Sequence, residues 1–448
     1  MPLTGIEIFK LLPKTNCGEC GVPTCLAFAM SLAAGKAELS ACPYVSDEAK
    51  EKLEDASTPP IRPVTIGAGE RAVKVGGETV MFRHEKRFEN PPGFAILISD
   101  AMAEADVDSR IDRLNNLHYD RVGLTLRPEL AAVKCESQDA AKFKSLVTKI
   151  KQNSNASIIL MSDNPDMLAA GLSVCADSKP LLYTATKDNI DKVAALAKAH
   201  SCPIAIRAGN LEELAELTTK LDQSGIKDII IDSGSRKIRQ AFKDQVVIRR
   251  AALEKKFRPL GYPTIILANE MTNDPMKEAL IAATFVAKYG GIIVLSDFQG
   301  ESLFPLLVLR LNIFTDPQRP LATTEGIYKI GNPDKSSPVL VTSNFSLTYF
   351  IVSGEIENSR VPSYLLVKDT EGLSVMTAWA AGKFGADTIA TFIKKCGIAD
   401  EVKHQKLIIP GYIAIESGGL EEELPDWEIL VGPREGAHIP AYLKTWKA

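Results

Sequence analysis

Short, nearly continuous apolar runs recur through the middle of the chain and alternate with stretches of helical spacing. Runs of this length are typical of strands buried on both faces of a parallel sheet. Stretches such as IDKVAALAKAH, which lie between the runs, place apolar residues three or four positions apart. The eight runs are FAILIS (94–99), RVGLTL (121–126), SIILMS (157–162), PLLYTAT (180–186), PIAIRA (203–208), DIIIDSG (228–234), PTIILAN (263–269) and GIIVLSD (291–297).

This alternation predicts an α/β fold whose centre is a TIM (βα)8 barrel. Eight strands and eight helices within about 220 residues match the size of such a barrel. An open, doubly wound sheet with the same number of strands remains the alternative.

A second, shorter alternation follows Pro320 and predicts a smaller, flavodoxin-like α/β unit. Its longest helical stretch covers residues 373–395. In such a sheet, ligands bind beyond the carboxyl ends of the strands. The apolar runs are VLVT (339–342), YLLVK (364–368), KLIIP (406–410) and EILVG (428–432), and the segments at their ends are TSNFS, DTEGLS, PGYIAIESGG and GPREG.

The pattern divides the chain into a small domain (1–57), a linker with a hairpin (58–93), the barrel (94–314) and a C-terminal domain (315–448). In the linker, AVKVGGETVMF is expected to turn at Gly-Gly. Two proline-containing stretches, STPPIRP and TDPQRPLATTEG, are expected to be joints about which the first and last domains move as rigid bodies. The alternative is that both stretches lie pinned on the surface.

Composition excludes several classes of protein. The net charge is −4 with no stripe of Lys and Arg, so nucleic acid is not an expected partner. The most apolar stretch, FPLLVLRLNIF, is short and contains Arg310, so no membrane span is expected. Eight cysteines in 448 residues are too few for a disulfide-stapled secreted fold. We therefore expect a soluble, cytoplasmic protein.

Four of the eight cysteines lie close together near the start of the chain, in the pattern C-x2-C-x4-C-x16-C. Cys17, Cys20, Cys25 and Cys42 supply four thiolates, which can hold either tetrahedral zinc or a 4Fe–4S cluster. Zinc ribbons prefer two matched C-x2-C pairs, and this segment has only one, which favours the iron cluster. The remaining residues with metal-ligating side chains are isolated and are not assigned to metal: Cys135, Cys175, Cys202, Cys396, His84, His118, His200, His404 and His438.

Polar side chains follow several of the predicted barrel strands. Asp100, Asp163, Asn269 and Asp297 would lie at the catalytic face of a TIM barrel. The same residue types are favoured as helix N-caps, and we place capping ahead of catalysis for them.

The cysteine motif CGECGVPTC with the later ACP cysteine, the barrel and the C-terminal α/β unit together resemble the large subunits of corrinoid iron–sulfur proteins. The resemblance covers essentially the whole chain. Two C-terminal segments make the resemblance specific: IYKIGNPDKSSPVLVTSNFSLTYFIV and KDTEGLSVMTAWAAGKFGAD. This family carries methyl groups in the acetyl-CoA (Wood–Ljungdahl) pathway.

The resemblance implies a role and a set of partners. A cobalamin-type corrinoid would accept a methyl group from methyltetrahydrofolate on a separate methyltransferase and donate it to acetyl-CoA synthase/carbon monoxide dehydrogenase. The chain would be a carrier rather than a stand-alone enzyme, and it would pair with a small corrinoid protein subunit as a heterodimer. The 4Fe–4S cluster on the four clustered cysteines would reactivate oxidised cobalt.

The resemblance also maps the corrinoid-binding loops onto three segments. No catalytic residue is implied. The implied cofactor-binding residues are Leu340, Thr342, Ser343, Asn344, Ser346, Thr370, Glu371, Gly372, Leu373, Ser374, Gly432, Pro433, Arg434, Glu435 and Gly436.

One motif is missing from the sequence. Many cobalamin domains carry D-x-H-x-x-G, whose histidine ligates cobalt, and no such motif occurs here. Without a strong axial donor, the reduced cobalt is easier to reach. The resemblance likewise implies a corrinoid that is held base-off, without a protein ligand. Two other functions stay open: a pterin-binding methyltransferase that uses the barrel mouth, and a simple iron–sulfur electron carrier.

Overall fold

The computed structural model describes residues 5–33, 37, 39–46, 49, 53, 58–121, 124–318 and 321–447. The chain forms two compact units. The first unit comprises residues 1–81, 88–117 and 128–314, and the second comprises residues 82–87, 118–127 and 315–448. No helix among the described residues is both long and apolar enough to cross a lipid bilayer.

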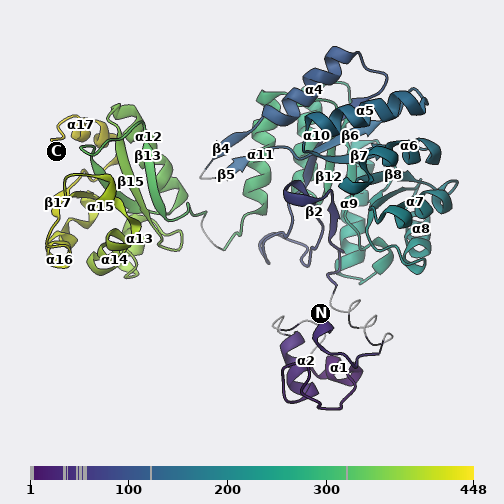
Figure 1. Cartoon of the computed structure of the whole chain (residues 1–448), viewed down its shortest axis with the longest axis horizontal. Helices are drawn as coiled ribbons and strands as arrows, with labels where there is room; N and C mark the ends of the chain where they lie inside the picture. Colours follow the sequence, from purple (N-terminus) through teal and green to yellow (C-terminus); the bar gives the residue numbers. More distant parts are fainter. Residues whose placement is uncertain are drawn as a thin grey trace. The chain divides into compact units, whose positions relative to one another are not determined.

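The first unit contains an eight-stranded parallel barrel surrounded by helices (Figure 1). The strand order is β10-β9-β8-β7-β6-β3-β12-β11, and a bridge between Ile231 and Thr264 brings β10 against β11. The TIM-barrel prediction is therefore confirmed. The strands are β3 (Gly93–Ser99), β6 (Leu130–Lys134), β7 (Ser157–Met161), β8 (Leu181–Ala185), β9 (Ile204–Arg207), β10 (Ile229–Asp232), β11 (Ile265–Leu267) and β12 (Ile292–Leu295).

The second barrel strand is not where the sequence predicted it. β6 pairs with both β3 and β7, so LAAVK is the barrel strand. The predicted run RVGLTL instead contributes to a small antiparallel pair, β4 (Tyr119–Arg121) and β5 (Leu124–Leu126). Alternating apolar and polar residues suit such a hairpin, whereas the small, apolar residues of LAAVK suit a strand that is buried on both faces.

Helices follow the barrel strands and cover the outside of the barrel (Figure 1). Several begin with a side-chain cap, as at Asp139, Asn164 and Asp274, whose side chains accept hydrogen bonds from the first-turn amides. The helices are α4 (Glu104–Asn116), α5 (Ala140–Asn153), α6 (Pro165–Cys175), α7 (Ile190–His200), α8 (Leu211–Gln223), α9 (Ile238–Leu253), α10 (Pro275–Ala287) and α11 (Gly300–Phe314).

A short antiparallel hairpin contributes to the barrel core. β1 (Val64–Ile66) pairs with β2 (Val73–Val75), and their inward side chains join the cluster formed by the interior residues of the barrel strands. The hairpin therefore turns at residues 67–72. The predicted turn at Gly-Gly is wrong, because those glycines follow β2 instead of joining two strands.

The stretch STPPIRP lies pinned from Thr58 onward. Arg258 donates hydrogen bonds to the carbonyls of Thr58 and Pro59, at 3.1 and 2.8 Å. Ile61 is buried, and the amide of Arg62 donates to the carbonyl of Gly261 at 2.9 Å. The described part of this stretch therefore packs on the barrel instead of acting as a joint. The rest of the predicted joint, at Ser57, lies outside the described residues.

The second unit is built on a five-stranded sheet of order β13-β15-β14-β16-β17. β14, β15, β16 and β17 run parallel, and β13 pairs antiparallel with β15 at one edge. The order of the parallel strands is that of a flavodoxin-like sheet, with its switch point between β14 and β16. The strands are β13 (Gly326–Ile330), β14 (Val339–Ser343), β15 (Ser363–Lys368), β16 (Lys406–Ile409) and β17 (Glu428–Val431).

Helices cover both faces of this sheet. Alternate strand residues pack on α12 (Ser346–Ser359) and α17 (Ile439–Leu443) on one face. On the other face they pack on α13 (Val375–Ala380), α14 (Ala386–Cys396) and α16 (Ser417–Glu423). The single helix predicted at 373–395 is thus two helices. The break lies at Gly382, whose φ of +69° ends α13.

The remaining short elements complete the chain. The N-terminal segment contains helices α1 (Gly5–Leu11) and α2 (Cys25–Ala33), which contact one another. Short 3-10 turns and one short helix lie between the other elements: η1 (Leu39–Ala41), η2 (Gly69–Arg71), η3 (Ala176–Ser178), η4 (Arg258–Leu260), η5 (Ala268–Glu270), α15 (Ile398–Glu401), η6 (Gly411–Glu416) and η7 (Gly436–His438).

Candidate cofactor sites

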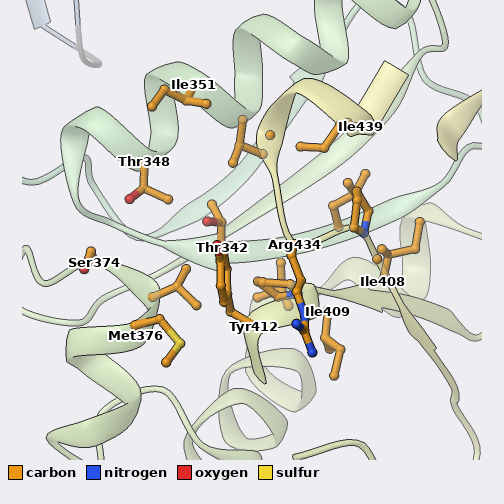
Figure 2. Close-up of a pocket in the computed structure, with 18 residues that line it drawn as sticks. Thr342, Thr348, Ile351, Ser374, Met376, Ile408, Ile409, Tyr412, Arg434 and Ile439 are labelled. Atoms are coloured by element: carbon orange, nitrogen blue, oxygen red, sulfur yellow. The ribbon is translucent and has the colours of Figure 1, made fainter. Parts of the chain in front are cut away.

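A pocket of about 310 Å³ lies at the carboxyl ends of β14 and β16, which is the switch point of the C-terminal sheet. Figure 2 shows side chains from α12, from the start of α13 and from the segment after β17 around it. Most of the lining is apolar: Leu340, Val341, Ile351, Val352, Val375, Met376, Ile408, Ile409, Pro410, Pro433 and Ile439. The polar side chains are Thr342, Thr348, Ser374, Tyr412 and Arg434.

Two loops approach each other closely at one wall of the pocket. A Cβ atom on Gly411 would lie 2.5 Å from the carbonyl oxygen of Gly432 and 2.8 Å from the amide nitrogen of Arg434. Only glycine fits where backbones are this close. Tyr412, next in the chain, donates a 2.5 Å hydrogen bond to Glu435, and this bond together with the carboxylate charge raises the pKa of Tyr412.

Several buried hydroxyl groups near this pocket have no hydrogen-bond partner within the described part of the chain. They are those of Thr323, Thr342, Ser343 and Ser346, and each residue is more than nine-tenths buried. Thr342 is the one among them that lines the pocket. A buried hydroxyl without a partner is costly, so a polar ligand group at Thr342 would relieve that cost.

The residues implied by the resemblance fall into three groups. Seven of them line the pocket: Leu340, Thr342, Ser374, Gly432, Pro433, Arg434 and Gly436. Ser343, Asn344, Ser346 and Thr370 are buried but are not part of the lining. Glu371, Gly372, Leu373 and Glu435 also lie outside the lining.

The cysteine-rich segment forms a small domain with its own core. Cys25 and Cys42 are buried in this core, Cys20 packs against it, and Cys17 is exposed. Asn16 braces the segment, because its amide N–H lies 3.4 Å from Cys25 Sγ and its side-chain oxygen accepts from the Cys25 amide at 2.8 Å. Among the described residues, no three Cys, His, Asp or Glu side chains converge as a ready metal site.

Tyr44 lies beside the cysteine motif. Its hydroxyl donates to Glu19 at 2.8 Å, and this hydrogen bond, with the charge of Glu19, raises the pKa of Tyr44.

The polar residues predicted at the barrel mouth serve mainly structure. Asp100 accepts hydrogen bonds from the Ser137 hydroxyl and from the amides of Ser137 and Glu136. Burial alone would raise the pKa of Asp100, but these bonds lower it. Asp163 pairs with Arg207 at 3.1 Å, and Asp297 pairs with Arg113. The side-chain oxygen of Asn269 is buried without a partner among the described residues.

A partly buried ion pair lies at the carboxyl end of β10. Arg236 binds both carboxylate oxygens of Asp232, at 3.0 and 2.8 Å, and also reaches Glu270. Tyr183 donates to Asp232 at 2.7 Å, and burial, followed by the Asp232 charge, raises the pKa of Tyr183 well above its usual value. These groups satisfy one another and leave no free base among them.

A family model described as "CO dehydrogenase/acetyl-CoA synthase delta subunit" matches residues 63–443, and a model described as "Putative Fe-S cluster" matches residues 12–44. The corrinoid/iron-sulfur protein large subunit of Moorella thermoacetica is 47% identical over 99% of both chains. The chain belongs to the corrinoid/iron–sulfur protein large-subunit family.

Archaeal proteins are also similar to this chain. The acetyl-CoA decarbonylase/synthase complex subunit gamma of Methanopyrus kandleri is 34% identical, over 99% of this chain and 97% of the relative. The subunit names disagree: the first family model is described as a delta subunit, whereas the full-length relatives are named large or gamma subunits. We follow the full-length relatives, because they span the cysteine motif and the "delta" model does not.

The solved structures that are similar to this chain match only part of it. Dihydropteroate synthase from Anaplasma phagocytophilum covers 50% of this chain and 99% of its own, with 12% identity and a TM-score of 0.38. A likeness at this level supports no argument about function.

Many residues that line the C-terminal pocket were not predicted from the sequence. The missed lining residues come mainly from α12 and from the segments after β15 and β16, for example Thr348, Ile351, Met376 and Tyr412. Tyr412 could have been predicted, because PGYIAIESGG follows a predicted strand and ligands bind at the carboxyl ends of strands in such sheets. The α12 residues gave no signal, because apolar residues occur all around that helix.

Proposed function

We propose that this chain is a methyl carrier that binds a corrinoid in the C-terminal pocket and a 4Fe–4S cluster at Cys17, Cys20, Cys25 and Cys42. When bound, the corrinoid supplies the cobalt that takes up and releases a methyl group, and the cluster supplies the electrons that restore reduced cobalt. Both cofactors are named in the family to which the chain belongs.

The observation that carries the proposal is the pocket itself. Its apolar walls suit the hydrocarbon parts of a corrinoid, and Thr342 offers an unpartnered hydroxyl to a polar group of the ligand. Arg434 is the one charged side chain among the described lining residues, and it suits the phosphate of the nucleotide tail. The pocket also lies where flavodoxin-like sheets bind ligands.

The cysteine-rich domain suits an iron–sulfur cluster by its donor set. Three cysteines occur within nine residues, and Cys42 reaches the same core. Backbone N–H groups that point at cysteine sulfur, as at Asn16, tune the reduction potential of such clusters.

No histidine lines the pocket among the described residues, which supports a corrinoid without a protein axial ligand. His404 lies at the opposite ends of the strands, where its Nε2 is 2.8 Å from the carbonyl of Ser337. His438 is exposed on η7 and is not part of the lining.

The proposed partners follow from the role. The methyl group would come from methyltetrahydrofolate through a separate corrinoid methyltransferase and would pass to acetyl-CoA synthase/carbon monoxide dehydrogenase in the cytoplasm. A small corrinoid protein subunit would complete a heterodimer. The naming of the archaeal relatives as subunits of an acetyl-CoA decarbonylase/synthase complex supports these partners.

Cobalt binding by the purified chain tests the proposal. We expect about one cobalt per chain after incubation with cobamide, and R434Q should weaken binding about three- to tenfold through loss of the phosphate contact. K395Q removes the same charge from an exposed position on α14 and should bind like wild type. A paramagnetic-resonance spectrum with axial nitrogen on Co(II) would contradict the base-off state. A chain that retains no cobalt would contradict the proposal.

A further inference from the structure

Asn344 follows β14 and links the two segments TSNFS and DTEGLS. The residue is only 4% exposed. Its side-chain oxygen accepts hydrogen bonds from the amides of Thr370 and Gly372, at 3.0 and 2.9 Å. Its side-chain nitrogen donates to a carboxylate oxygen of Asp369 at 2.8 Å. Both ends of the amide are therefore occupied by the chain itself.

The segment that Asn344 holds contains a tight turn. Residues 371 and 372 have φ values of +57° and +76°, and the amide of Leu373 donates to the carbonyl of Thr370 at 3.2 Å. Two consecutive positive φ values with this hydrogen bond are the marks of a type I′ turn. Its first central position holds Glu371, a residue type that rarely adopts positive φ, so the turn needs support from outside.

Asn344 supplies that support at three points. Besides the two amides, the hydroxyl of Thr370 lies 2.8 Å from the Asn344 oxygen and 2.8 Å from the carbonyl of Leu373, and it can donate to either. The side-chain amide of Asn344 combines an oxygen that accepts from this turn with a nitrogen that donates to Asp369.

The turn leads directly into a wall of the pocket. Ser374 precedes α13, and Ser374, Val375 and Met376 all line the pocket, whereas Asn344 does not. We propose that Asn344 is a positioning residue for the corrinoid site, which acts by holding the 370–373 turn so that residues 374–376 form the wall. This inference rests on the proposed function of the pocket.

An aspartate at position 344 gives the sharpest test. N344D would face the carboxylate of Asp369, and the two carboxylates repel each other unless they share a proton. The other charged groups around this loop are paired: Lys368 with Glu325, and Lys383 with Glu371. We expect cobamide binding by N344D to be at least tenfold weaker than wild type at pH 8 and to recover most of that loss at pH 5.

A second pair of variants tests the turn itself. N344A should weaken cobamide binding at least tenfold and speed amide hydrogen exchange at residues 370–373 in the cofactor-free chain. Adding E371N creates Asn-Gly, the pair that type I′ turns prefer, and should recover at least threefold of the lost affinity. N358A, which changes an asparagine of α12 outside the pocket lining, is the matched control and should match wild type.

The outcomes separate the inference from the proposed function. If N344A bound cobamide like wild type, or lost binding while its turn amides stayed protected, Asn344 would not be a positioning residue. A pH-independent loss in N344D would also overturn it. If wild type bound no cobamide, the proposed function would fail, and hydrogen exchange in N344A would still show whether Asn344 holds the turn.

Discussion

At the scale of single residues, the cysteine assignment gives the first prediction. C20A should lower the iron content of the purified chain well below four per chain and remove the iron–sulfur absorbance, because a 4Fe–4S cluster uses four thiolates. C202A removes a buried thiol outside the motif and should leave both readings unchanged. Four irons retained in C20A would remove Cys20 from the ligand set.

The buried thiols of the barrel give a pH prediction. Burial is the main cause that raises the pKa of Cys175 to about 12 and the pKa values of Cys135 and Cys202 to about 11. Because these values exceed the unfolded value of about 8.5, their contribution to stability is complete below that pH and is lost as the pH rises toward 11 and 12. The free energy of unfolding should therefore fall above about pH 9.

The measurement is a series of denaturant titrations between pH 7 and pH 11. C202A should reduce the alkaline slope by about one proton, since one of the three thiols is gone. A slope that C202A leaves unchanged would show that other groups cause the alkaline loss.

For Thr342 we predict that one substitution raises the stability of the cofactor-free chain and weakens cobamide binding. T342V keeps the side-chain shape but removes the unpartnered hydroxyl, so the cofactor-free chain should gain about 1 kcal/mol in stability. Cobamide binding should weaken about fivefold, because the hydroxyl no longer meets the ligand. T323V removes another buried, unpartnered hydroxyl outside the lining, and it should stabilise without any change in binding. Equal binding by both variants would show that Thr342 makes no ligand contact.

At the scale of elements, the contact between the loops after β16 and β17 gives the fourth prediction. G411A would force a Cβ against the Gly432 carbonyl, so we expect a loss of about 1–3 kcal/mol and a tenfold or greater loss of cobamide affinity. The control is G354A on α12, where a Cβ meets no atom within 4 Å and should stabilise by about 0.5–1 kcal/mol. Calorimetry and cobalt retention measure both effects. Wild-type affinity in G411A would mean that the close approach does not shape the pocket.

The barrel elements show how far sequence reasoning reaches. Seven of the eight predicted runs coincide with barrel strands, because continuous apolar runs identify strands that are buried on both faces. RVGLTL failed because β-branched residues favour any half-buried strand, including those of a hairpin. LAAVK was missed because alanine is a poor strand former, although small side chains fit the crowded interior of a barrel.

The pocket shows the same limit. The strand ends could be predicted, since flavodoxin-like sheets bind ligands there, and seven of the implied residues line the pocket. Which face of α12 points inward depends on the packing of the sheet, and the even spread of its apolar residues hides that face. The role of Asn344 could not be predicted either, because the partners of a buried amide are known only once the loops are placed.

At the scale of the whole molecule, the structure changes the expectation for the first of the two joints, and the second stays a prediction. Thr58 to Arg62 are bound to the barrel, and Leu321 and Thr323 pair with the segment after β14. Limited proteolysis should therefore spare residues 58–62 and 321–323 and cut the second joint near Pro317 and Gln318, which are exposed. Mass spectrometry of the fragments would locate the cuts. A preferred cut at residues 59–62 would show that the first stretch detaches from the barrel in solution.

The placement of tryptophan has an optical consequence. All three tryptophans of the chain, Trp379, Trp427 and Trp446, belong to the C-terminal unit. Trp379 and Trp427 pack with its core, and Trp446 donates to the carbonyl of Ser336. Tryptophan fluorescence therefore reports on this unit alone, because the barrel contains no tryptophan. Since a corrinoid absorbs visible and near-ultraviolet light, filling of the pocket should dim that emission, and occupancy can be followed without any label.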